Sequence, residues 1–72
     1  MAQAKKIKEI PSTLTIGKGK KKEVFTHYIS LKSSEAAIDS KEQIKSHFKK
    51  VRIEEFILDG SEIHSIYIIR ND

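Results

Sequence analysis

Residues 51–70 have the sequence VRIEEFILDGSEIHSIYIIR, in which two β-rich segments flank Asp59-Gly60. An Asp-Gly pair between such segments is typical of a two-residue hairpin turn, because both residue types tolerate the positive φ angles that the turn requires. The turn also sets the register, since residues equally far from it face each other. The expected pairs are Leu58 with Ser61, Phe56 with Ile63, Glu55 with His64, Ile53 with Ile66 and Val51 with Ile68.

This hairpin is apolar on both of its faces. One face carries Val51, Ile53, Ile57, Ile66 and Ile68, and the other carries Phe56, Leu58, Ile63, Tyr67 and Ile69. A sheet that is covered by one helix needs only one apolar face. The face of Phe56, Leu58, Ile63, Tyr67 and Ile69 is therefore a candidate interface, most simply with a second copy of the chain. The alternatives are a strongly curled sheet or an N-terminal segment that folds across this face.

A first hairpin is expected upstream. Its first strand is most secure over residues 12–16, because Pro11 cannot donate a hydrogen bond to a neighbouring strand. The Gly- and Lys-rich residues 17–22 form the loop, and residues 23–31 form the second strand. Strict alternation along that strand places Phe25, His27, Ile29 and Leu31 on one face.

One helix is expected within residues 40–50, after a connector over residues 33–40 that can hold an early helical turn at residues 35–37. Asp39 or Ser40 can cap its N-terminus, and Glu42 lies in its first turn. At the helical spacing, one apolar stripe contains Ala37, Ile44, His47, Phe48 and Val51. This stripe is expected to face the core.

The order of elements predicts an α+β domain, β-β-α-β-β, with one helix on one face of a four-stranded sheet. The arrangement is similar to a β-grasp sheet, in which the first and last strands lie parallel at the centre. Pro11 argues against a central first strand, so either the strand begins after Pro11 or the first hairpin lies at an edge. Residues 1–6 are expected to form a flexible basic tail and residues 7–72 the single domain.

Composition limits the function. The chain has 72 residues and no cysteine, which excludes disulfides, thiolate metal sites and cysteine nucleophiles. A chain of this length does not enclose a deep enzyme cleft. The longest apolar run, residues 66–69, is too short to span a membrane, and the N-terminal residues lack the apolar segment of a secretory signal. We expect a cytoplasmic protein without a membrane partner.

The positive charge is concentrated in two segments. The net charge is +4, with 14 Lys and Arg against 10 Asp and Glu. The loop contributes Lys18, Lys20, Lys21 and Lys22, and the expected helix contributes Lys45, Lys49 and Lys50, of which Lys45 and Lys49 continue a stripe from Lys41. The loop is not a phosphate-binding P-loop, since its glycines are two apart and a strand follows it. If the helix runs back toward the loop, these seven lysines form one anion-binding end; the alternative is a solvated surface.

No catalytic or metal-binding set is apparent. His27, His47 and His64 are far apart in the chain and have no neighbouring ligand pattern. Glu54 and Glu55 point to opposite faces of their strand, and the expected pairing of Glu55 with His64 is explained by a cross-strand ion pair. We therefore expect no enzyme, no metal, no cofactor and no small-molecule substrate.

These features favour a small basic accessory or regulatory protein, of the kind that phages and mobile elements encode. It would bind nucleic acid non-specifically through its Lys-rich end. The same charge would also suit an acidic protein surface. The alternative is a protein-interaction module or inhibitor that docks through the apolar face of the C-terminal hairpin, with a homodimer as one form of it.

Overall fold

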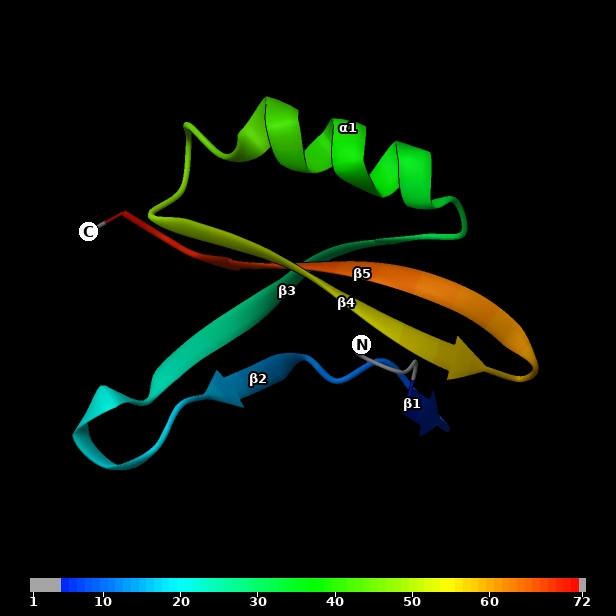
Figure 1. Ribbon diagram of the computed structural model, residues 1–72, viewed down its shortest axis with the longest axis horizontal. Coiled ribbons are helices and arrows are strands. Elements are labelled where there is room, and N and C mark those ends of the chain that lie inside the picture. Colours follow the sequence, from blue (N-terminus) through cyan, green and yellow to red (C-terminus); the bar gives the residue numbers. More distant parts are fainter. Residues whose placement is uncertain (1–4, 72) are drawn as a thin grey trace.

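A computed structural model of the chain describes residues 5–71 and has an α+β architecture, with one helix packed on a curled five-stranded sheet (Figure 1). The strands are β1 (Lys5–Ile7), β2 (Thr13–Ile16), β3 (Glu23–Leu31), β4 (Lys50–Leu58) and β5 (Ser61–Ile69), and the helix is α1 (Ser34–Ile44). The strand order is β1-β4-β5-β3-β2. The sheet is mixed, because β1 pairs with β4 in parallel while the other neighbours are antiparallel.

The C-terminal hairpin forms as predicted. All five expected pairs, from Leu58 with Ser61 to Val51 with Ile68, are present between β4 and β5. Asp59 and Gly60 have φ angles of 51° and 78°, so both residues of the turn have the positive φ that a type I′ turn requires. The register follows from this local backbone geometry, which is why the sequence alone was sufficient to predict it.

The β-grasp-like order is not observed, and the sheet has five strands in place of four. The central strand is β5, which pairs antiparallel with β4 on one edge and with β3 on the other. Six consecutive residues of β5, 63–68, are buried, so this strand needs neighbours at both edges and cover on both faces. The strand that follows Pro11, β2, lies at an edge of the sheet and begins at Thr13, in agreement with both of the arrangements that Pro11 allows.

The helix begins and ends earlier than predicted. It spans Ser34–Ile44, and its N-cap is Ser33, whose Oγ accepts a hydrogen bond of 3.3 Å from the Ala36 amide. The predicted connector over residues 33–40 is therefore largely helical. After the helix ends, the half-buried Phe48 packs edge-to-face on Tyr28, with ring centroids 5.6 Å apart. Phe48 thus reaches its apolar contact from a turn and not from a helical stripe.

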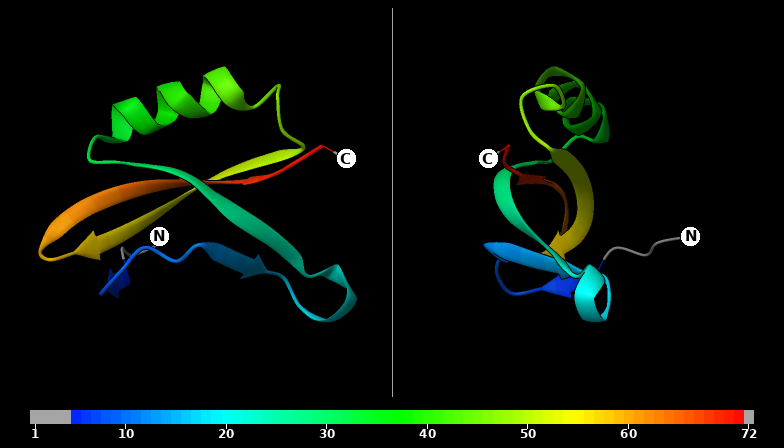
Figure 2. Two further views of the ribbon diagram at one scale, coloured as in Figure 1. Left: turned by 180° about the vertical axis from the view of Figure 1, so that it is seen from behind. Right: turned by 90° about the vertical axis from the view of Figure 1, so that its left-hand side faces the viewer.

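The second apolar face of the C-terminal hairpin is covered by the N-terminal segment. Side views show α1 on one side of the central strands and β1 and β2 on the other (Figure 2). Phe25, Phe56 and Tyr67 form the core on this side, packed against Ile7, Ile10, Leu14, Ile16 and Ile69. The Tyr67 hydroxyl donates a hydrogen bond of 2.6 Å to the Pro11 carbonyl. Curling of the sheet and folding of the N-terminal segment, the two alternatives to an interface, are therefore both present.

The five residues of the candidate interface are largely buried within one chain, so most of this face is not free to contact a partner. Phe56, Ile63 and Tyr67 are only 4 %, 8 % and 0 % exposed, and Leu58 and Ile69 are half-buried. The predicted tail over residues 1–6 is also revised, because Lys5–Ile7 form β1. Residues 1–4 of that tail lie outside the described residues. Ile7 explains the difference, since it joins the core cluster.

Strand β3 contains an irregularity that the alternation did not predict. Its register with β5 shifts between His27 and Ile29. His27 lies opposite Tyr67, whereas Ile29 lies opposite Ile66, which points to the other face of β5. The predicted face of Phe25, His27, Ile29 and Leu31 is therefore divided between the two sides of the sheet.

Candidate nucleic-acid interface

The first basic segment is a compact turn between β2 and β3. Residues Gly19–Lys21 form a 3-10 turn, in which the Lys21 amide donates a hydrogen bond of 3.1 Å to the Lys18 carbonyl. Gly17 has a φ of 105°, and a Cβ at this position would lie 2.6 Å from the Lys21 carbonyl oxygen. Glycine is therefore required for the chain to close the turn. The turn exposes the side chains of Lys18, Lys20, Lys21 and Lys22.

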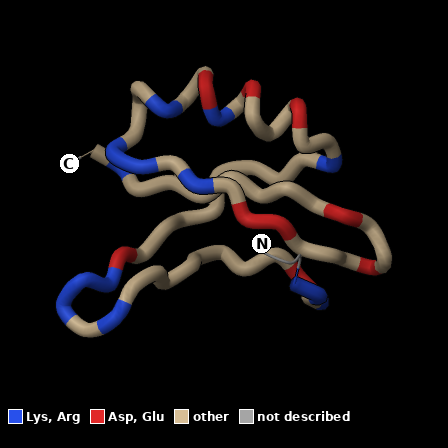
Figure 3. Tube along the Cα trace, viewed as in Figure 1, with Lys and Arg blue, Asp and Glu red and all other residues tan. Residues whose placement is uncertain are grey.

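The second basic segment joins α1 to β4. Lys45 is the C-cap of the helix, and the Lys49 amide donates a hydrogen bond of 2.8 Å to the Ile69 carbonyl. The helical stripe of Lys41, Lys45 and Lys49 is not formed, because Lys49 follows the end of the helix. Both basic segments nevertheless lie at the same end of the molecule, opposite the β4–β5 turn (Figure 3).

Two carboxylates reduce the free charge of this end. Lys50 Nζ lies 2.6 Å from Glu23 Oε2, which connects the start of β4 to the start of β3. Lys45 Nζ lies 2.5 Å from Glu42 Oε2, and this hydrogen bond and charge lower the pKa of Glu42. Within residues 5–71, Lys18, Lys20, Lys21, Lys22 and Lys49 have no carboxylate within 4.0 Å. Of the seven predicted lysines, these five are the ones most available to an anion.

An open groove of about 650 Å³ lies at this end of the molecule, and Lys50 is the one of the seven predicted lysines that lines it. It is lined by Ile16, Glu23, Phe25, Lys41, Lys50, Val51, Arg52 and Ile53. β1 pairs only with Phe56–Leu58, so within the described chain the edge of β4 over residues 50–55 has no partner strand. Lys41 and Arg52 were not among the predicted site residues. Little in the sequence indicated that these two residues belong to a site, because Arg52 lies in an apolar strand and Lys41 was assigned to a helical stripe.

The histidines have three different environments. His27 Nε2 is 2.7 Å from Ser30 Oγ, which in turn is 2.8 Å from the buried Ser65 Oγ. His47 is exposed in the turn after α1. His64 is buried beside Glu55 and Glu62, and the potential ligand atoms of these three residues lie within 4.8 Å of one another. The prediction that no ligand set exists did not anticipate this group, although the predicted pairing of Glu55 with His64 already contained two of its members.

Comparison of the chain with protein-family models, with curated proteins and with solved structures gives no match. Among residues 5–71, no helix is long and apolar enough to cross a membrane.

Proposed function

We propose that this chain binds nucleic acid non-specifically through Lys18, Lys20, Lys21, Lys22, Lys45, Lys49 and Lys50, as a small basic accessory or regulatory protein. The observation that supports this is the position of two lysine-rich segments, far apart in the sequence, at one end of the molecule (Figure 3). Lysines gathered at one end, with Lys50 lining an open groove there, can contact phosphates along a nucleic-acid backbone.

The side chains at this end favour backbone contact over base reading. Bidentate recognition of bases relies mainly on the guanidinium fork of Arg. The chain has two arginines, and Arg52, the one at the groove, is engaged with Glu54. The only α-helix of the described residues packs against the sheet through its buried Ala37. Recognition would therefore be electrostatic, through ammonium and phosphate groups.

A salt titration measures the number of phosphate contacts. Each contact with duplex DNA contributes about −0.9 to the log–log slope of affinity against salt, so the five unpaired lysines predict a slope of about −4.5. The variant K20Q/K21Q/K22Q should flatten that slope by about 2.7, because it removes three of these contacts. Fluorescence anisotropy with labelled random DNA and RNA duplexes gives the measurement.

A matched control distinguishes the effect of where the lysines lie from the effect of the net charge of the chain. The variant K5Q/K6Q/K8Q removes the same three charges from the N-terminal segment, near the opposite end, where Ile7 pairs with Leu58 next to the β4–β5 turn. It should leave the slope nearly unchanged. Equal flattening by both variants, or no binding of DNA or RNA at about 50 mM salt, would contradict the proposal.

A protein-interaction module or inhibitor, including a homodimer, is the second candidate. Its support now comes from β3, where Val24, Tyr28 and Ile29 are 57 %, 47 % and 39 % exposed, and not from the largely buried face of the C-terminal hairpin. Sedimentation at increasing concentration tests the homodimer. A mass near twice 8.2 kDa that returns to the monomer value in Tyr28→Ser would support it, and a monomer at all concentrations would exclude self-association.

A further inference from the structure

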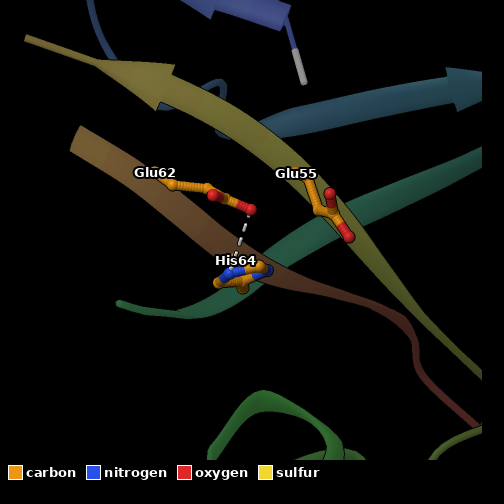
Figure 4. A group of neighbouring side chains, drawn as sticks. All are labelled: Glu55, Glu62 and His64. Carbon is orange, nitrogen blue, oxygen red and sulfur yellow. Dashed lines mark ion pairs between the residues drawn. The ribbon is translucent and has the colours of Figure 1, made fainter. Parts of the chain in front are cut away.

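The β4–β5 hairpin brings one histidine and two glutamates together on the face that carries the helix (Figure 4). Glu55 lies directly opposite His64, and Glu62 lies two residues before His64 on the same strand. Cross-strand and diagonal neighbours of this kind share one face and approach closely. The potential ligand atoms of the three residues, one from each, all lie within 4.8 Å of one another.

His64 is the unusual member of this group. The residue is 6 % exposed, and its Nε2 is 3.6 Å from Glu62 Oε1, beyond the usual hydrogen-bond range. Within residues 5–71 its ring forms no hydrogen bond. Buried polar groups normally have a partner. Since the described residues contain no fully buried side-chain nitrogen that lacks a hydrogen-bond partner, the ring nitrogens of His64 keep some contact with solvent.

The two glutamates also lack basic partners. Within residues 5–71 the ion pairs of Lys and Arg join Lys45, Lys50 and Arg52 to other carboxylates, and no Lys or Arg lies within 4.0 Å of Glu55 or Glu62. In a chain with excess lysine, two neighbouring carboxylates thus have only His64 as a potential cationic partner. A bound cation would compensate both of these charges.

We propose that Glu55, Glu62 and His64 form a binding site for a divalent transition-metal ion, of which Zn²⁺ is the best fit. Imidazole nitrogen and carboxylate oxygen bind Zn²⁺ at about 2.0–2.2 Å, and three protein ligands leave one position for water. Mg²⁺ and Ca²⁺ fit less well, because they prefer a shell of oxygen ligands alone.

Small side-chain movements are enough to close the site. Ligand atoms around a tetrahedral Zn²⁺ lie about 3.3 Å apart at these bond lengths. The side chain of Glu62 is 60 % exposed and Glu55 is also exposed, so both can change rotamer without moving the strands. His64 is held in place by burial and by the pairing of β5 with β3 and β4.

The test is titration of the purified chain with zinc chloride, followed by calorimetry and by the ring nitrogen resonances of the histidines. We expect one Zn²⁺ per chain, with a shift of the His64 resonances, while those of His27 and His47 serve as internal references. Glu55→Gln and Glu62→Gln should each weaken binding by at least about 10-fold, since loss of even an outer-shell partner has an effect of that size.

Glu54→Gln is the matched control, because Glu54 lies next to Glu55 but on the opposite face of β4. It should bind Zn²⁺ as the wild type does, and millimolar Mg²⁺ should not compete. Circular dichroism verifies that each variant is folded. The proposal is overturned if folded Glu55→Gln and Glu62→Gln bind Zn²⁺ unchanged, if the shifted ring is the exposed His47, or if millimolar zinc leaves every resonance in place.

Discussion

The hydrogen bond between the Tyr67 hydroxyl and the Pro11 carbonyl ties the N-terminal segment to the centre of the sheet. Tyr67 is fully buried, and its ring packs edge-to-face on Phe56 and on His27. Tyr67→Phe keeps the ring and removes only the 2.6 Å hydrogen bond. Such a bond contributes about 0.5–1.5 kcal/mol net, and more where the remaining acceptor is left without a partner. Since Pro11 is half-buried, water can reach its carbonyl in part, and we expect a loss of about 1–2 kcal/mol.

Urea titration and thermal unfolding measure this loss. At about 4–8 °C per kcal/mol for a domain of this size, the midpoint should fall by about 4–16 °C. Tyr28→Phe is the control, because Tyr28 is 47 % exposed and its hydroxyl has no hydrogen bond within the described residues. Its effect on the free energy of unfolding should stay within about 0.5 kcal/mol.

Hydrogen exchange locates the effect. In Tyr67→Phe the amides of β2 that bond to β3 should exchange faster, while those between β4 and β5 should change only with global stability. If Tyr67→Phe and Tyr28→Phe lose the same stability, or if exchange accelerates uniformly, the N-terminal segment does not depend on this contact.

Three further results are expected. Phe56→Ala should lower the free energy of unfolding by about 3–5 kcal/mol, because Phe56 is a core residue at 4 % exposure. Phe48→Ala should lower it by only about 1–2 kcal/mol, because Phe48 is half-buried. Equal losses for the two variants in urea titrations would contradict this difference. Burial, with the charge of Glu54 as a second cause, raises the pKa of Tyr67 above 10.0. The folded state then holds the Tyr67 hydroxyl proton more tightly than the unfolded state does, so stability present below pH 10 is lost as the pH rises through the folded pKa. In thermal scans between about pH 8 and pH 12, Tyr67→Phe should therefore lose less stability with rising pH than the wild type does. In chemical denaturation, Gly17→Ala should lower the free energy of unfolding by more than about 2 kcal/mol and Gly19→Ala by about 1 kcal/mol. The difference is expected because, of these two positions, only Gly17 would bring a Cβ against a carbonyl oxygen.

The sequence alone determined the features that depend on neighbouring residues. Asp59-Gly60 specifies a turn whose backbone angles set the register of every pair in the C-terminal hairpin. Two glycines and four lysines between apolar segments were sufficient to predict the basic loop. The pairing of Glu55 with His64, one side of the proposed metal site, followed from the same register. These features are local, because each one is determined by residues that are close together in the sequence.

Only the tertiary structure decided the helix bounds, the strand order and the cover of the second apolar face. Ser33 and Ser40 are both competent N-caps, and the structure uses Ser33, whose Oγ accepts a hydrogen bond from the Ala36 amide. Tyr67 and Pro11 are 56 residues apart, yet their hydrogen bond helps to hold the N-terminal segment on the curled sheet. Contacts of this kind stabilise a segment only when the partner surface has already formed, so no local pattern in the sequence encodes them.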